Sequence, residues 1–118
     1  MADKKEIKKN YKQTPRLMGI YQIRNLASGK IYIGRSADLN GKLNSERFQL
    51  KNGMHMNRQL QDDFNSLGEG KFVFEILDRL PPGPEPDHDH HEDLQVLEGM
   101  WLDKLQPFDA RGYHKKKP

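Results

Sequence analysis

Two short β-prone segments joined by a polar turn constrain this chain more than any other feature of its sequence. Residues 18–24 read MGIYQIR, and residues 29–36 read GKIYIGRS. The residues between them, NLAS, contain the turn formers asparagine and serine. These segments predict a β-hairpin of two antiparallel strands.

The pairing of these strands decides which side chains share a face. In the register expected for a turn of even length, Tyr21 lies opposite Tyr32, and Gly19 lies opposite Gly34. Two phenols would then lie beside a surface without side chains, which a phosphodiester backbone can approach closely. Phenols can also donate hydrogen bonds or carry protons. Tyrosine is equally common in ordinary strand packing, and glycine at β-bulges, so on the residues alone both interpretations stay open.

Helical and alternating patterns follow the hairpin. The sequence predicts a helix over residues 39–51 capped by Asp38, a second helix from about residue 57 up to Gly68, and a strand over residues 71–78. A last helix begins at Asp93 and is closed by Pro107. The residues expected to face the core are Met56, Leu60, Phe64 and Leu67 on the second helix, and Leu94, Leu97, Trp101 and Leu105 on the last. The order β-β-α-α-β-α predicts an α/β (α+β) fold with a small, mostly antiparallel three-stranded sheet flanked by helices.

The chain has room for one domain at 118 residues. We expect a basic N-terminal arm over residues 1–17 and a domain over residues 18–118 that ends in a basic tail. A segment rich in proline, aspartate and histidine, residues 80–92, predicts a surface loop. Its histidines are of a metal-binding type but have no fixed spacing, so a solvated loop is preferred.

Positive charge gathers at the two ends of the chain, while the middle is acidic. The net charge is only +3, but basic arms around a less basic body suit a polyanionic partner, because each neutralised phosphate releases counterions. A purely solubilising role of the arms is equally compatible with the charge alone. The residues expected to contact nucleic acid are Lys4, Lys5, Lys8, Lys9, Lys12, Arg16, Arg47, Lys115, Lys116 and Lys117.

Composition excludes several classes of protein. Cysteine is absent, so neither a disulfide framework nor a thiolate metal site can form. No run of 18 apolar residues is present, and the first residues lack the apolar stretch of a signal peptide. We therefore expect an intracellular, cytoplasmic protein that does not contact membranes and is a monomer by default.

Glu98 stands inside the apolar stripe of the last predicted helix, four residues after Leu94 and three before Trp101. Burying an ionised carboxylate without a partner is costly, so a salt bridge, hydrogen bonds or a metal ion must accompany it. Spacing alone leaves an ion pair and a metal ligand equally open.

The paired motifs resemble the GIY-YIG nuclease family. Residues 19–21 read Gly-Ile-Tyr, and residues 32–34 read Tyr-Ile-Gly at the expected short separation. The wider pattern also agrees, from about Gly19 to Tyr113. It is carried by Asn25, Gly29, Lys30, Ser36, Leu39, Leu50, Gly53, His55, Asn57, Leu60, Gln61, Asn65 and Gly68, and by residues 98–102.

This resemblance implies hydrolysis of DNA phosphodiester bonds with help from one divalent ion. By position, Glu98 would bind Mg²⁺ or Mn²⁺, Tyr21 would be the general base, and Tyr32 would orient the water or a phosphate oxygen. DNA is the expected partner, and RNA stays an alternative.

Three positions depart from the family pattern and are expected to weaken activity. Lys42 replaces the usual arginine and lacks its bidentate fork. Glu46 replaces the usual histidine or tyrosine and is expected to repel a phosphate, although it could pair with Lys42 at i,i+4. His114 replaces the usual asparagine. Arg35 and Arg47 lie near enough in the sequence to supply the missing arginine.

Three functions therefore stay open. The preferred one is a metal-dependent DNA endonuclease, because Tyr21, Tyr32 and Glu98 are all retained. The main alternative is a catalytically degenerate GIY-YIG module that binds nucleic acid without cutting it. A metal-responsive interaction domain that uses the histidine loop is the third.

Overall fold

A computed structural model of the chain describes residues 17–81 and 90–115. Its strands are β1 (Met18–Asn25), β2 (Ile31–Ser36) and β3 (Phe72–Leu80), and its helices are α2 (Leu39–Lys51), α3 (Arg58–Leu67) and α4 (His91–Leu105). Two short 3-10 helices lie at Glu69–Lys71 and Asp109–Arg111. The strands form one antiparallel sheet in the order β2-β1-β3. The predicted fold class and element order are confirmed, while most of the expected arm and loop lies outside the described residues.

Local capping explains where the first two helices begin and end. The Asp38 side chain accepts a hydrogen bond from the Gly41 backbone at 3.2 Å, which caps α2. Asn57 does the same for α3 through the Leu60 backbone at 3.0 Å. Gly68, with a φ of 87°, ends α3 in a conformation that glycine adopts without strain. These boundaries match those predicted from the sequence.

One face of the sheet packs against α2 and α3. Ile23 of β1 shares a buried cluster with Leu50 of α2 and with Leu60 and Phe64 of α3. Met56 and Leu67 were expected in this core, but their side chains are 94% and 41% exposed. That prediction was wrong because α3 begins only at Arg58 and ends at Leu67, so both residues lie at its margins.

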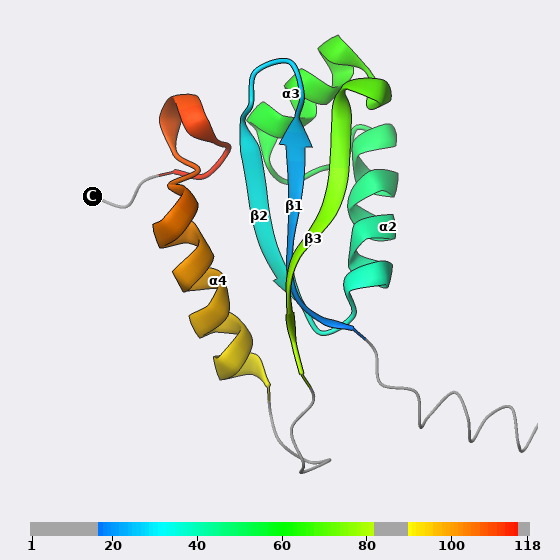
Figure 1. Ribbon diagram of the computed structural model, residues 1–118. Coiled ribbons are helices and arrows are strands. Elements are labelled where there is room, and N and C mark those ends of the chain that lie inside the picture. The colour runs from blue at the N-terminus through cyan, green and yellow to red at the C-terminus, as the bar shows by residue number, and fades with distance from the viewer. Residues whose placement is uncertain (1–16, 82–89, 116–118) are drawn as a thin grey trace, which may run out of the picture.

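The opposite face is covered by α4, as Figure 1 shows. Leu94 is buried there, and the Trp101 indole donates to Asp78 of β3 at 2.9 Å. The helix crosses near β2, the edge strand of the sheet. Residues of α4 therefore meet the free edge of β2.

The hairpin register differs from the predicted one by two residues. Tyr21 pairs with Gly34, and Ile23 pairs with Tyr32, so the two tyrosines share a face without lying opposite each other. The Asn25 side chain accepts hydrogen bonds from the backbone of residues 27 and 28, at 2.9 and 3.2 Å. The Asn25 backbone pairs with Lys30 at 2.9 Å. Asn25 thus closes the turn one position later than expected.

Gly19 has a structural role and is not part of a bare surface beside the tyrosines. Its φ is 154°, and a Cβ at this position would overlap the backbone oxygen of Asp78. The register of β1 against β3 shifts between Ile20 and Tyr21. Gly19 therefore lies next to a β-bulge in β1, close to the alternative interpretation that the glycines mark a bulge.

The C-terminal segment returns to the edge of β2. The Tyr113 backbone donates to Ile31 at 3.0 Å. The Tyr113 hydroxyl accepts from Asn25 at 3.0 Å and donates to Asp63 at 2.7 Å. This segment lies along the first half of the β2 edge, where Gly112 bridges to Ile31 and the His114 ring accepts the Ile33 N–H. None of the described helices is both long and apolar enough to cross a membrane.

Candidate active site

A pocket of about 480 Å³ lies beside β2. It is lined by Tyr21, Tyr32, Ile33, Gly34, Arg35, Lys42, Glu98, Leu102 and His114. Strands β1 and β2, helices α2 and α4 and the C-terminal segment each contribute to it. The structure thus brings together six of the predicted site residues from separate parts of the chain.

Tyr21 reaches this pocket because Gly34 has no side chain. A Cβ at position 34 would overlap the Tyr21 hydroxyl. The phenol therefore crosses β2 in the space above Gly34, and the residue is only 1% exposed. Burial raises the pKa of Tyr21 well above its ordinary value, and the negative charge of Glu46 raises it further. Burial and the charges of Glu46 and Glu98 raise the pKa of Tyr32 to about 12.

Glu98 of α4 faces the pocket and pairs with Arg35 of β2. The Arg35 Nη1 to Glu98 Oε1 distance is 2.6 Å. The ion-pair interpretation of Glu98 is thus confirmed, and its position in the pocket keeps the metal interpretation open. Within residues 17–81 and 90–115, no group of three or more histidine, aspartate or glutamate residues could hold a metal ion. One carboxylate fits an ion such as Mg²⁺ that keeps most of its waters, but not a fully protein-bound ion.

Glu46 lies behind the pocket and is 3% exposed. Its carboxylate pairs with Lys42 at 3.3 Å, which confirms the expected i,i+4 ion pair, and also with the His55 ring. Burial acts to raise the pKa of Glu46, but the hydrogen bond from His55 and the charge of Lys42 outweigh it and hold that pKa below its ordinary value. Glu46 is therefore a buried anion whose carboxylate is held by Lys42 and His55.

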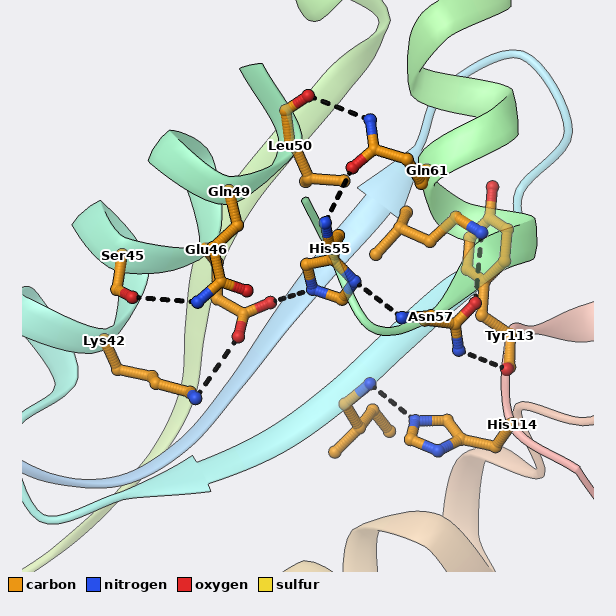
Figure 2. Close-up of polar contacts among 12 residues, drawn as sticks. Lys42, Ser45, Glu46, Gln49, Leu50, His55, Asn57, Gln61, Tyr113 and His114 are labelled. Atoms are coloured by element: carbon orange, nitrogen blue, oxygen red, sulfur yellow. Dashed lines mark hydrogen bonds and ion pairs between the residues drawn. The ribbon is translucent and has the colours of Figure 1, made fainter. Parts of the chain in front are cut away.

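His55 is a site residue that the sequence did not single out for a role. Its Nδ1 accepts the Asn57 backbone N–H at 3.0 Å, so the ring proton is on Nε2, which donates to Glu46. Gln61 holds the His55 backbone at 2.9 Å, and Figure 2 shows these contacts in one network. The only signal in the sequence was its place in the wider family pattern.

Known proteins similar to this chain include endonucleases. No family model matches the chain. A curated relative, intron-associated endonuclease 1 of Enterobacteria phage T4, is 32% identical over 90 residues, which are 74% of this chain and 32% of the relative. The catalytic domain of the homing endonuclease I-TevI superposes with a TM-score of 0.70 at 27% identity, covering 85% of this chain and 99% of that domain.

The chain belongs to the GIY-YIG nuclease family. A mutant of the intron endonuclease I-TevI catalytic domain also matches, with a TM-score of 0.67 at 27% identity over 83% of this chain and 92% of the other. The chain spans about a third of the length of the curated relative. The likeness therefore concerns the GIY-YIG domain, whose two motif tyrosines both line the pocket.

His114 closes one side of the GIY-YIG pocket. Its Nε2 accepts the Ile33 backbone N–H at 2.8 Å, and its ring stacks on Tyr32 with centroids 5.0 Å apart. Burial lowers the pKa of His114, although the charge of Glu98 opposes this. His114, which stands where the family usually has asparagine, thus serves as a neutral acceptor for the backbone N–H of Ile33.

Replacing His114 with asparagine should make the domain less sensitive to acid. Because the folded pKa of His114 is lowered from 6.5, its stabilising contribution is present above that value and is lost as the pH falls below it. An amide oxygen can accept the same hydrogen bond without titrating. Between about pH 7.5 and about pH 5.5, the wild-type Tm should fall a few degrees more than that of His114→Asn. Parallel Tm curves in a thermal melt would mean that His114 is not held neutral.

The other described basic residues that were predicted to contact nucleic acid do not line this pocket. Arg47 stacks on Phe74 of β3 at 4.6 Å and lies 3.9 Å from Glu69. Of the two arginines considered for the missing position, Arg35 lines the pocket, whereas Arg47 packs against β3. Lys115 lines a larger groove of about 1360 Å³ that shares Tyr32 and His114 with the pocket. Lys4, Lys5, Lys8, Lys9, Lys12, Arg16, Lys116 and Lys117 lie outside the described residues.

Proposed function

We propose that this protein is a metal-dependent DNA endonuclease that acts through its GIY-YIG pocket. One observation carries the proposal: Tyr21, Tyr32, Arg35 and Glu98 line a single pocket. The pocket is open and polar, as a site for a phosphodiester must be. Membership of a nuclease family and the endonuclease relatives support the same activity.

In this proposal Tyr21 receives a proton from the attacking water, and Tyr32 orients that water or a phosphate oxygen. Arg35 and Lys42 contribute positive charge beside the phosphate. Glu98 would hold the Mg²⁺ or Mn²⁺ ion, which would neutralise charge on the phosphate and on the departing oxygen. Arg35 replaces the usual arginine because its guanidinium is already in the pocket, 2.6 Å from Glu98.

The larger groove offers a path for the DNA strand next to the pocket. Lys30, Arg58 and Lys115 line it together with Tyr32 and His114. These cations suit phosphate contacts, whereas Asp62 and Asp109 in the same groove would limit non-specific attraction. The basic residues before Leu17 and after Lys115 would add further phosphate contacts.

The direct test is incubation of the purified chain with supercoiled plasmid DNA in the presence of Mg²⁺, Mn²⁺ or EDTA. We expect nicked or linear DNA with either metal and intact plasmid with EDTA. Gel shift with the same DNA measures binding separately. Binding without cleavage in every metal would favour the degenerate module, and neither binding nor cleavage would contradict both functions.

A further inference from the structure

The proposed metal ligand, Glu98, already has a cationic partner in the pocket. Arg35 Nη1 lies 2.6 Å from Glu98 Oε1 and donates a hydrogen bond to it. Arg35 belongs to β2 and Glu98 to α4, which lies beside that strand in Figure 1. The two side chains are 32% and 19% exposed, so solvent screens their attraction less than that of a surface pair. The negative charge that a divalent ion requires is therefore already neutralised.

The other charges around the pocket do not supply an unpaired carboxylate. Among the described residues that line it, Glu98 is the only acid, whereas Arg35 and Lys42 are cations. Lys42 is itself paired at 3.3 Å with one oxygen of Glu46, and the His55 ring holds the other oxygen. In the absence of DNA, the pocket is therefore better matched to an anion such as a phosphodiester than to a divalent cation.

A DNA phosphate would change this balance. A guanidinium offers five N–H donors in a planar fork, which fits a phosphate as well as a carboxylate. Arg35 can therefore transfer hydrogen bonds from Glu98 to a phosphate in the same pocket. Glu98 would then regain its negative charge, and the phosphate would add a second one beside it. Oxygen ligands of this kind, carrying negative charge, are those that Mg²⁺ prefers.

We propose that Arg35 makes metal binding at Glu98 depend on DNA. Without DNA, Arg35 neutralises the carboxylate and keeps its metal affinity low. With a phosphate in the pocket, Arg35 pairs with the phosphate and Glu98 becomes available. This inference rests on the proposed endonuclease function. Since Arg35 acts on metal binding through Glu98, it is in this respect a positioning residue.

Titration calorimetry with Mn²⁺ alone tests the state without DNA. Arg35→Gln removes the positive charge, and we expect it to bind Mn²⁺ about tenfold more tightly than wild type, equivalent to about 1.4 kcal/mol. Arg35→Lys keeps the charge and should stay close to wild type. Arg35→Met, which keeps the aliphatic stem, provides a second uncharged variant should Arg35→Gln fail to fold.

Arg24→Gln is the matched control for this titration. Arg24 also pairs with a glutamate, Glu75, at 3.0 Å, but neither residue lines the pocket. Its replacement should leave Mn²⁺ affinity unchanged. An equal gain in Arg24→Gln and Arg35→Gln would mean that freeing any carboxylate on the sheet attracts the ion, which would contradict a specific role of Arg35.

A double variant shows whether the gain acts through Glu98. Arg35→Gln combined with Glu98→Gln should bind Mn²⁺ little better than Glu98→Gln alone, because the carboxylate that Arg35 neutralises is absent. The rise in Tm on adding Mn²⁺ gives the same comparison where binding is too weak for calorimetry. A tenfold gain in the double variant would mean that Arg35 acts on the ion independently of Glu98, and the proposed relation would be wrong.

The dependence on DNA is measured through DNA affinity, because DNA itself binds Mn²⁺. By linkage, the factor by which DNA strengthens metal binding equals the factor by which the metal strengthens DNA binding. Fluorescence anisotropy of a labelled duplex, with and without Mn²⁺ at constant ionic strength, gives this factor. Tyr21→Phe serves as the background in every arm, because loss of the proposed base slows cleavage during the titration.

In this background we expect saturating Mn²⁺ to strengthen DNA binding by about tenfold or more when Arg35 is present. The gain should be several-fold smaller in Arg35→Gln and absent in Glu98→Gln. Equal gains with and without Arg35, or equal Mn²⁺ affinities of wild type and Arg35→Gln, would overturn the role of Arg35 while leaving the nuclease intact. Absence of plasmid cleavage by wild type would instead contradict the proposed function itself.

Discussion

Glu98→Gln should reduce DNA cleavage by at least about a thousandfold, equivalent to about 4 kcal/mol of lost transition-state stabilisation. The amide has the shape of the carboxylate but lacks the charge that holds a divalent ion. Glu98 is the metal candidate in the pocket, and no cluster of three or more potential ligands exists in residues 17–81 and 90–115 to compensate. Single-turnover rates at saturating Mg²⁺ measure the loss.

Two further measurements separate a metal ligand from a structural carboxylate. Titration calorimetry with Mn²⁺ should show binding to wild type and at least about tenfold weaker binding to Glu98→Gln. Glu75→Gln is the matched control, since Glu75 also pairs with an arginine, Arg24, at 3.0 Å on the same face of the sheet. It should lose neither cleavage nor Mn²⁺ binding. Wild-type Mn²⁺ affinity in Glu98→Gln would mean that Glu98 serves only as the partner of Arg35.

Gly34→Ala should lower cleavage on the order of a hundredfold, because the added Cβ would occupy the space of the Tyr21 hydroxyl. Tyr21 is buried and cannot move aside without disturbing its neighbours. Gly70→Ala is the control, since a Cβ there would contact nothing within 4 Å. Cleavage and thermal unfolding of both variants should be measured together, and Gly70→Ala should match wild type in both.

A double-mutant comparison shows whether the loss in Gly34→Ala acts through Tyr21. Tyr21→Phe alone should cost a similar factor, and adding Gly34→Ala to it should cost little more, because the reactive hydroxyl is already absent. If the two losses multiply instead, Gly34 matters for the approach of DNA to the pocket, and its proposed relation to the Tyr21 hydroxyl is wrong.

Local sequence patterns determined the elements of this domain. The isoleucine and tyrosine alternation defined the hairpin, and Asp38, Asn57 and Gly68 marked helix boundaries through hydrogen bonds or backbone conformations within a few residues. For a turn of even length, the period of two placed Tyr21 and Tyr32 on one face, and the two-residue difference in register left them there. The stripe of α4 placed Glu98 toward the sheet. Each of these depends on interactions that are short-range in the chain, so each could be predicted.

Tertiary structure alone decided how these elements form a site. Asn25, which ends the turn, also donates to the distant Tyr113 hydroxyl at 3.0 Å, and the resulting register places Gly34 opposite Tyr21. Packing of α4 brought Glu98 to Arg35, which is 63 residues away in the sequence. The end of α2 folded back to set His55 against Glu46. The i,i+4 pairing of Glu46 with Lys42 was predictable, whereas the burial of Glu46 and its contact with His55 were not, because burial is not encoded in local spacing.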